Sequence, residues 1–342
     1  MRRTILKTTP IREEAMLQSG ILTRRRMVAF AALAFVASSG PTRAQGLPPG
    51  DVHFICGFAA GSGADLIVRF FGEKMRPILG RNIIVENRPG AIGNIATEYV
   101  ARAKPDGLTV YVTSGDALAT NMHIFKNPPV DVVKQLQIVT TINRMPMTIA
   151  VAATSPHKTL AELTAAMKEK GTKASYSTNN PPARVVGAMY KEKAGLNSVE
   201  VQYRSSAETL NDVTSGAVDY AIYDPVFATI QSKQGKVRVL AVATGQRLQS
   251  APEYPTMTEL GYPMDLVSWW GAMVPMGTPR PIIDKLNEAF VAVITSEEGK
   301  KFLASIASDP WLLKPEEAQE YWRKEVDQWR DHVRFAKIEP QG

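Results

Sequence analysis

The chain has 342 residues, enough for two domains of ordinary size, and its 44% hydrophobic and 21% charged residues are typical of a globular protein. Its formal net charge is +7, but residues 1–44 alone hold eight Arg or Lys and two Glu, which leaves about +1 for the remainder. A nearly neutral body lacks the dense positive charge that holds nucleic acid, so we expect no nucleic-acid partner.

The first 44 residues are typical of an export signal. Arg24, Arg25 and Arg26 precede an apolar run over residues 27–37 that is too short to cross a bilayer, and small residues lead to Ala44. We therefore expect a signal peptide that is cleaved after Ala44. The paired arginines leave two export routes as alternatives, a twin-arginine signal and a general secretory signal. Translation could start at Met1 or at Met16.

Strand and helix patterns alternate in the next part of the chain. Apolar runs predict strands at 52–56, 82–87 and 108–113, and helical spacing predicts helices from Asp65, as N-cap, to Gly80 and over 96–103. Such alternation at short intervals predicts βαβ units and a parallel sheet.

A second α/β module follows, and after it a helical tail. The module has predicted strands at 147–152, 173–177, 200–203, 218–223 and 237–244, and predicted helices at 159–170, 183–194 and 207–215. An extended segment at 269–275 and a helix at 281–295 come next. Trp322, Val326, Trp329 and Val333 form an apolar stripe, which predicts a last helix that packs back on one of the two modules.

The stretch FICGFAAGSGAD, residues 54–65, fits none of the common catalytic or nucleotide motifs. The third glycine of a dinucleotide fingerprint falls on Leu66, and neither a Gly-Lys-Ser/Thr nor a G-x-S-x-G sequence is present. Cys56 is the only cysteine, and we predict a buried thiol at a strand end. A nucleophile would need a base beside it, such as His53 or His123. No metal-ligand spacing is found, so we expect neither metal nor cofactor.

What this stretch does offer is a site for an anion. Small residues at a strand-to-helix turn let backbone N–H groups converge, and the helix start adds partial positive charge. The turn around Gly90 is of the same kind and belongs to the same sheet edge. Two ordinary glycine turns are the alternative interpretation of the same residues.

Several motifs together resemble one family. GFAAGSGAD (57–65), ENRPGAIGN (86–94), VDYAIYDP (218–225), PTMTELGYP (255–263) and SWWGAMVPMGTPRP (268–281) are similar in order and spacing to the solute-binding proteins of tripartite tricarboxylate transporters, the Bug family of periplasmic receptors. The resemblance implies a two-lobed periplasmic-binding-protein fold of type II-like α/β class. Each lobe would have a mainly parallel sheet flanked by helices, with the ligand cleft between the lobes. Lobe I would comprise residues 46–145 plus 270–342, and lobe II residues 146–269.

The resemblance also implies a function. The protein would be a monomeric periplasmic receptor that captures a mono-, di- or tricarboxylate, aromatic acids included, and delivers it to the membrane components of the transporter without catalysis. A ligand-sensing receptor that presents its closed form to a sensor kinase is an alternative from another class. An exported enzyme that uses the same cleft is a further one.

The ligand-binding residues implied by the resemblance come from both lobes. The first lobe would contribute the first strand-to-helix loop with the turn at Gly90 and the strand end at Ser114; the loop comprises Phe58, Ala59, Ala60, Gly61, Ser62, Gly63, Ala64 and Asp65. The second lobe would contribute Ser177, Thr178, Asn179, Arg184, Tyr203, Arg204 and Asp224.

Five positions depart from the family pattern. Cys56-Gly57 stands where Val-Pro is usual, and Ala64 replaces Thr or Ser, which removes one hydroxyl from the loop. Arg184 stands in place of histidine and Arg204 in place of lysine. A guanidinium binds a carboxylate through a planar fork, so either arginine could hold the distal carboxylate of a dicarboxylate, and a solvated surface arginine is the alternative for each.

Overall fold

The computed structural model describes residues 46–342, so the predicted signal peptide, its cleavage at Ala44 and the choice between Met1 and Met16 lie outside the described residues. Within residues 46–342, no helix combines the length and the apolar character needed to cross a membrane.

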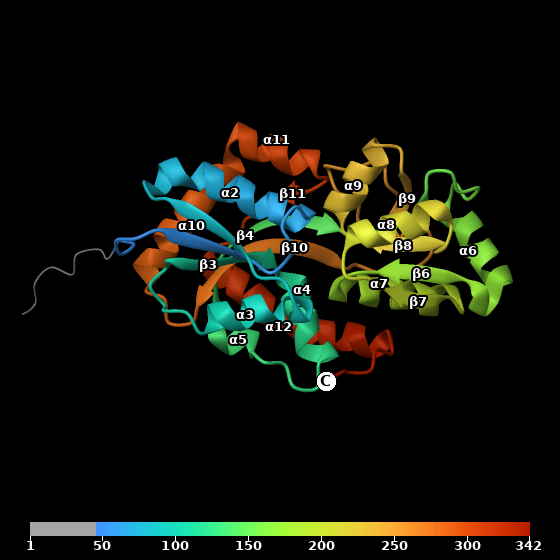
Figure 1. Ribbon diagram of the computed structural model, residues 1–342, viewed down its shortest axis with the longest axis horizontal. Coiled ribbons are helices and arrows are strands. Elements are labelled where there is room, and N and C mark those ends of the chain that lie inside the picture. Colours follow the sequence, from blue (N-terminus) through green and yellow to red (C-terminus); the bar gives the residue numbers. More distant parts are fainter. Residues whose placement is uncertain (1–45) are drawn as a thin grey trace, which may run out of the picture. The chain divides into compact units, whose positions relative to one another are not determined.

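Two sheets organise the described chain, one in each lobe (Figure 1). The first lobe is built on six strands, in the spatial order β11 (Asp309–Pro310), β4 (Leu136–Pro146), β10 (Val267–Pro275), β3 (Thr109–Ser114), β1 (Val52–Cys56) and β2 (Ile83–Asn87). The second lobe is built on five, in the order β7 (Val199–Gln202), β6 (Ser175–Thr178), β8 (Tyr220–Tyr223), β5 (Thr148–Ala152) and β9 (Val237–Val242). The two-lobed α/β fold class is thus confirmed.

Each sheet is mixed rather than mainly parallel. β1 pairs in parallel with β2 and β3, and β6 pairs in parallel with β7 and β8, as the βαβ units predict. In the first sheet β10 runs antiparallel to β3 and β4, and β11 antiparallel to β4; in the second β5 runs antiparallel to β8 and β9. Each of these antiparallel pairs includes β4, β5 or β10, the strands next to the two crossings of the chain between the sheets. The first crossing is at Met147, between β4 and β5, and the second lies between β9 and β10.

Helices cover both faces of each sheet. In the first lobe one face is covered by α2 (Gly63–Leu79), α10 (Arg280–Thr295) and α11 (Glu297–Ser305), and the other by α3 (Asn94–Ala101), α4 (Gly115–Ile124) and α12 (Pro315–Phe335), with the short α5 (Val132–Gln135) nearby. In the second lobe α6 (Leu160–Lys170) and α7 (Pro181–Ala194) lie on one face, and α8 (Ser206–Ser215) and α9 (Pro225–Lys233) on the other. Two 3-10 turns, η1 (Ala91–Gly93) and η2 (Gly171–Lys173), complete the list.

Most predicted elements are confirmed to within two residues at their ends, but one cap is wrong. α2 begins at Gly63 with Ser62 as its N-cap, and Asp65 lies in its first turn. The Ser62 hydroxyl accepts from the Asp65 N–H, the pattern of a capping serine. The helix ends at Gly80, whose left-handed backbone (φ 60°) suits glycine.

The C-terminal helix packs back on the first lobe, as the apolar stripe predicts. Trp322, Val326, Trp329 and Val333 of α12 are all buried. Within the same apolar cluster lie residues of both lobes, so the core is continuous between them. Beneath the stripe the buried Glu325 carboxyl accepts from Trp269 Nε1 at 2.5 Å, which ties α12 to β10.

We predict that Gly115→Ala destabilises the first lobe. A Cβ at Gly115 would lie 2.0 Å from the ring of Trp269, which is fully buried and cannot move aside. Such overpacking costs about 1–3 kcal/mol, so thermal unfolding should begin at a clearly lower temperature than in the parent protein. Gly46→Ala, whose Cβ would meet only the end of Lys285 at 3.8 Å, is the control. An unchanged unfolding midpoint for Gly115→Ala would contradict this close packing.

Candidate functional site

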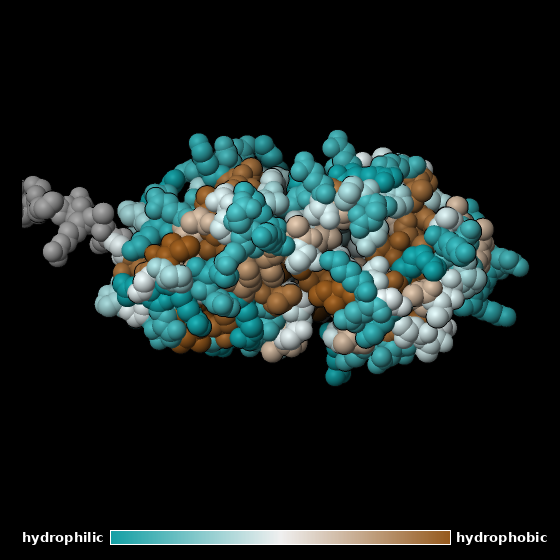
Figure 2. Space-filling model, turned by 90° about the horizontal axis from the view of Figure 1, so that it is seen from above, coloured by the Kyte–Doolittle hydropathy of each residue, from teal (hydrophilic) through white to brown (hydrophobic). Residues whose placement is uncertain are grey.

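A cavity of about 530 Å³ is lined by residues of both lobes. Its walls come from the segments that follow β1, β3, β6, β7 and β8, each at the carboxyl end of a strand in the parallel part of its sheet. Figure 2 shows hydrophobic surface gathered near the middle of the described chain, between its two halves. Ligands of open α/β sheets bind at such strand ends, which makes this cavity the candidate site.

Five helices begin at this cavity. Their N-cap residues all belong to its lining: Ser62 of α2, Ser114 of α4, Asn180 of α7, Ser205 of α8 and Asp224 of α9. Each helix start presents backbone N–H groups and partial positive charge, and here they come from both lobes. The arrangement therefore favours a negatively charged ligand.

The side chains of the cavity add little charge of their own. Of its lining residues, Arg204 is the one cation and Asp224 the one acid. Burial raises the pKa of Asp224, while hydrogen bonds from the Phe227 N–H at 2.9 Å and from Ser206 at 3.3 Å act in the lowering direction. Asp224 is thereby engaged as the cap of α9.

The loop before α2 is held open by a buried carboxylate behind it. Asp65 Oδ2 accepts from the Gly61 N–H at 2.8 Å and from Arg69 Nε at 2.9 Å, and Asp65 Oδ1 accepts from Asn87 Nδ2 at 2.8 Å. Asn87 Nδ2 also donates to the Phe58 carbonyl at 3.1 Å. Burial would raise the pKa of Asp65, but the hydrogen bonds from Arg69, Gly61 and Asn87 outweigh it and lower that pKa.

The glycine at position 57 is required by a tyrosine behind the loop. A Cβ there would lie 2.7 Å from the hydroxyl of Tyr111, which is buried and lies 3.3 Å from Thr97 Oγ1. The space that a larger residue would need is thus taken by Tyr111. Ala64 lies in the cavity wall, where it offers a methyl group and no hydroxyl.

Most of the predicted ligand-binding residues line the cavity. They are Phe58, Ala59, Ala60, Gly61, Ser62, Gly63, Ala64, Ser114, Asn179, Arg204 and Asp224. The others do not: Asp65, Gly90, Ser177, Thr178, Arg184 and Tyr203.

Each residue outside the lining has another place. Asp65 supports the loop from behind, and Gly90 lies in the turn that caps η1, at φ 127°. Ser177 and Thr178 are buried in β6. Arg184 Nε lies 3.3 Å from Glu200 Oε1, and the Tyr203 hydroxyl is 2.5 Å from Asp212. Whether any of these residues affects binding stays a prediction.

Other residues of the cavity were missed from the sequence. Met145 and Met147 flank the crossing into the second lobe, Ser268 and Trp270 belong to β10, and α9 supplies an apolar face. The start of α9 had a usable signal, because Asp224 followed by Pro225 is a cap followed by a first-turn proline.

Cys56 is the buried thiol that the sequence predicts. Burial raises its pKa to about 11, which disfavours a thiolate nucleophile. His53 Nδ1 lies 2.5 Å from Glu86 Oε1, and His123 Nε2 lies 2.6 Å from the Val326 carbonyl. Both candidate bases therefore have other partners. In residues 46–342 no group of three or more His, Cys, Asp or Glu could hold a metal ion.

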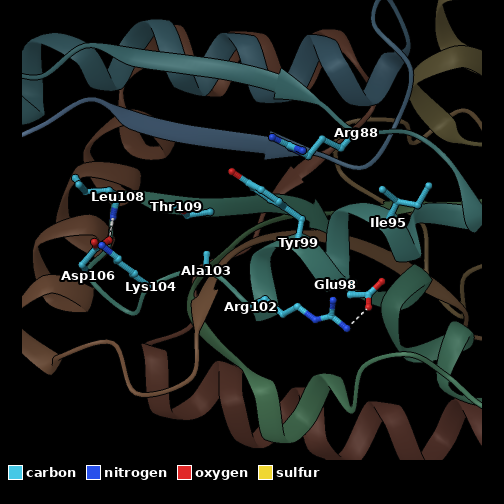
Figure 3. A pocket seen from close by; sticks show the side chains of 10 residues that line it. All are labelled: Arg88, Ile95, Glu98, Tyr99, Arg102, Ala103, Lys104, Asp106, Leu108 and Thr109. Carbon is cyan, nitrogen blue, oxygen red and sulfur yellow. Dashed lines mark hydrogen bonds and ion pairs between the residues drawn. The ribbon is translucent and has the colours of Figure 1, made fainter.

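A second hollow, of about 630 Å³, lies on the first lobe beside the last turn of α3 (Figure 3). It includes Leu108 and Thr109, at the opposite end of β3 from Ser114. Figure 3 shows Arg88 over the ring of Tyr99, at 3.6 Å from its centroid, and Arg102 joined to Glu98. Arg88 and Arg102 both have acidic partners, and α3 presents its C-terminal end, which carries partial negative charge. This hollow therefore suits an anion less well than the cavity between the lobes does.

Comparisons with known proteins agree with the geometry. A family model described as "Tripartite tricarboxylate transporter family receptor" matches residues 67–336. A protein of Bordetella bronchiseptica that is named only as a UPF0065 protein is 31% identical over 262 residues, 77% of this chain and 78% of that protein.

Two solved structures are similar along nearly the whole described chain. Periplasmic binding protein BugD has a TM-score of 0.79 and 30% identity, covering 86% of this chain and 100% of that one. R. palustris Rpa4515 with adipate has a TM-score of 0.81 and 26% identity, covering 86% and 99%.

We predict that Asp65→Asn destabilises the fold. Both carboxylate oxygens of Asp65 accept from N–H donors, so the amide nitrogen of asparagine would face a donor with which it cannot form a hydrogen bond. About 1–3 kcal/mol of unfolding free energy should therefore be lost near pH 7. Because the pKa of Asp65 is lowered on folding, its contribution is present above the unfolded pKa of about 3.9 and is lost as pH falls through the folded pKa. The difference between variant and parent should therefore shrink in acid, as denaturant titrations across this range would measure.

The control for this experiment is Asp51→Asn, which changes an exposed carboxylate. A deficit of Asp65→Asn that stayed constant from neutral to strongly acidic pH would contradict the ionised network.

We further predict that Gly57→Ala and Tyr111→Phe are coupled. Alanine at position 57 should cost about 1–3 kcal/mol in the parent protein, because its Cβ meets the tyrosine hydroxyl. In the Tyr111→Phe background, which lacks that hydroxyl, Gly57→Ala should cost less unfolding free energy. A double-mutant cycle by chemical denaturation measures the difference. Equal costs in both backgrounds would show that the hydroxyl does not impose the glycine.

Proposed function

The chain belongs to the tripartite tricarboxylate transporter family of receptors, and on that premise we propose that it captures a small organic carboxylate in the cavity between its lobes. The observation that carries the proposal is the convergence of five helix N-termini on one cavity. Backbone N–H groups make charge-assisted hydrogen bonds to a carboxylate without a catalytic side chain. The similar protein Rpa4515 with adipate supports the same class of ligand.

We place the protein in the periplasm, where it would present its ligand to the membrane components of a tripartite transporter. The family description supports this role, and the similarity to periplasmic binding protein BugD together with the basic, apolar N-terminus supports this location. The proposed lobe boundaries are those of the sequence, 46–145 with 270–342 and 146–269. The crossing at Met147 supports the first boundary, whereas β10 of the first lobe already begins at Val267, so the second crossing lies just before the boundary at residue 270. Closure of the lobes over the ligand would be the signal to the transporter.

We expect carboxylates, and not their neutral amides, to bind. The purified protein would be titrated calorimetrically with mono-, di- and tricarboxylates, with aromatic acids and with the matching amides, and thermal unfolding would be followed in parallel. A bound carboxylate at a hundred times its Kd stabilises the fold by about 2.7 kcal/mol, which raises the unfolding midpoint. Binding of amides or cations in place of acids would refute the carboxylate assignment.

The transport role has a separate test. Cells that lack this chain should lose uptake of the carboxylate that the titrations identify, and the intact gene should restore it. Normal uptake together with a lost transcriptional response to that carboxylate would favour a sensing receptor instead.

A further inference from the structure

One buried polar side chain of the cavity has no partner within the described chain. Gln231 of α9 lines the cavity and is only 9% exposed, yet its Oε1 accepts no hydrogen bond from residues 46–342. Its backbone carbonyl is engaged, since it accepts from the Lys236 N–H at 2.9 Å. Buried side-chain amides are nearly always hydrogen-bonded, because an unpaired one has lost its water without a replacement. The free amide of Gln231 therefore points to a group that comes from outside the chain.

The other polar side chains of the cavity do not share this property. Most of them hydrogen-bond within the protein: Ser62, Ser114, Asn179, Asn180, Ser205, Ser206 and Asp224. Arg204 is exposed, so water can solvate its guanidinium. Among the lining residues of the described chain, Gln231 alone has a buried side-chain atom that lacks a partner.

The helix that carries Gln231 is held against the first lobe at both of its ends. A Cβ at Gly63, the first residue of α2, would lie 3.0 Å from Val226 Cγ1, so the start of α9 packs against the start of α2. Near the other end of α9, Lys233 Nζ donates to the Ser305 carbonyl of α11 at 3.1 Å. Gln231 lies between these two contacts, so both lobes fix its place in the wall.

The surroundings of the amide are apolar. Val226, Phe227 and Ile230 line the cavity from the same helix, and Phe227 lies one helical turn before Gln231. In such surroundings a hydrogen bond to the amide is electrostatically stronger than in water. Five residues at 1.5 Å each place Gln231 about 7.5 Å beyond Val226 along the helix axis. That span is within reach of a small organic acid whose carboxylate occupies the loop before α2.

The chemistry of an amide determines which group can pair with it. Its oxygen accepts hydrogen bonds and its nitrogen donates them. A hydroxyl or a carboxamide supplies a donor and an acceptor together, so it can satisfy either end. A carboxylate only accepts, and it would leave the Gln231 oxygen unpaired beside a negative charge. An alkyl group would leave both ends unpaired.

We propose that Gln231 determines the specificity of the cavity, and that the ligand carries an uncharged hydroxyl or carboxamide which pairs with the Gln231 amide. This inference rests on the proposed function, because the carboxylate of the same molecule occupies the loop before α2. The amide then favours such a ligand over an acid of the same shape that lacks the group, since the second acid leaves a buried polar side chain without a partner.

The experiment titrates the purified protein calorimetrically with matched organic acids over a series of chain lengths. Each set keeps one carboxylate and varies one other group, which is a hydroxyl, a carboxamide, a methyl or a second carboxylate. At the best length the hydroxyl or the carboxamide compound should bind about 10-fold more tightly than the methyl compound, as expected for one buried hydrogen bond. The carboxamide should also bind more tightly than the second carboxylate of the same shape.

Gln231→Met keeps the size of the side chain and removes both ends of the amide. It should reduce the preference over the methyl compound to about twofold or less, without weakening the binding of the methyl compound. Because the variant replaces an unpaired buried amide with an apolar group, its unfolding midpoint without ligand should equal or exceed that of the parent protein.

The matched control is Gln234→Met, which changes an exposed glutamine at the C-cap of the same helix, outside the cavity lining. It should leave the preference at its parent value. A second measurement uses the parent protein: in ¹⁵N–¹H spectra the side-chain NH₂ signals of Gln231 should shift further with the hydroxyl or carboxamide compound than with the methyl compound.

The outcomes separate this proposal from the function on which it rests. Equal binding of the hydroxyl, carboxamide and methyl compounds, or a preference that survives Gln231→Met, overturns the role of Gln231 while carboxylate capture stands. Tighter binding of the second carboxylate than of the carboxamide overturns the uncharged group. A lowered unfolding midpoint of Gln231→Met without ligand would show that the amide already has a partner, which also overturns the proposal. Absence of binding by every acid overturns capture itself.

Discussion

The hydrogen bonds of Asp65 are the interaction on which the candidate site depends. A loop that binds an anion through its backbone has to keep several N–H groups free. Without support, those N–H groups would donate to nearby carbonyl oxygens of the same loop or to water. Asp65 prevents collapse by holding Gly61 from one side, while Asn87 holds both Asp65 and the Phe58 carbonyl from the other. The network joins the loop, α2 and the end of β2, so the loop shares the rigidity of the sheet.

The gathering of helix starts follows from the sheet topology. In a parallel strand–helix unit every helix begins at the carboxyl edge of the sheet, so adjacent units bring their N-termini to one side. α2 and α4 do so in the first lobe, and α7, α8 and α9 in the second. The antiparallel strands β5 and β10 lie next to the crossings, and the cavity is lined from both carboxyl edges. The partial positive charge at the cavity is thus a property of the fold rather than of a few basic side chains.

Local patterns predicted most of the elements, because apolar periodicity and turn residues act over short distances. The loop over residues 58–64 was found in this way, since its small residues precede a clear helix. Local patterns could not predict whether the side chains of Arg184 and Arg204 face the cavity or an ion-pair partner. Arg184 and Arg204 look equivalent in sequence, and only the pairing of β6 with β7 brings Glu200 to Arg184.

Other errors have the same physical origin. Asp65 is a good capping residue by type, but the carboxylate supports the loop and Ser62 caps the helix. The mixed sheets could not be inferred because strand direction depends on how the chain crosses between lobes, and a strand reads the same in either direction. The sequence analysis also did not predict that Met145 and Met147 line the cavity, because they do so by lying where the chain crosses between the lobes.

Recognition through main-chain groups also bears on how such a receptor can change. A substitution in the loop before α2 alters a side chain but leaves the amide hydrogen in place unless it introduces proline, so the proposed contacts to a carboxylate would survive most point mutations there. Substitutions on the facing wall along α9 would instead alter the surface that meets the rest of the proposed ligand. A few replacements on one side of the cleft could thereby fit the same fold to a different solute, while the backbone contacts to the shared carboxylate group stay the same.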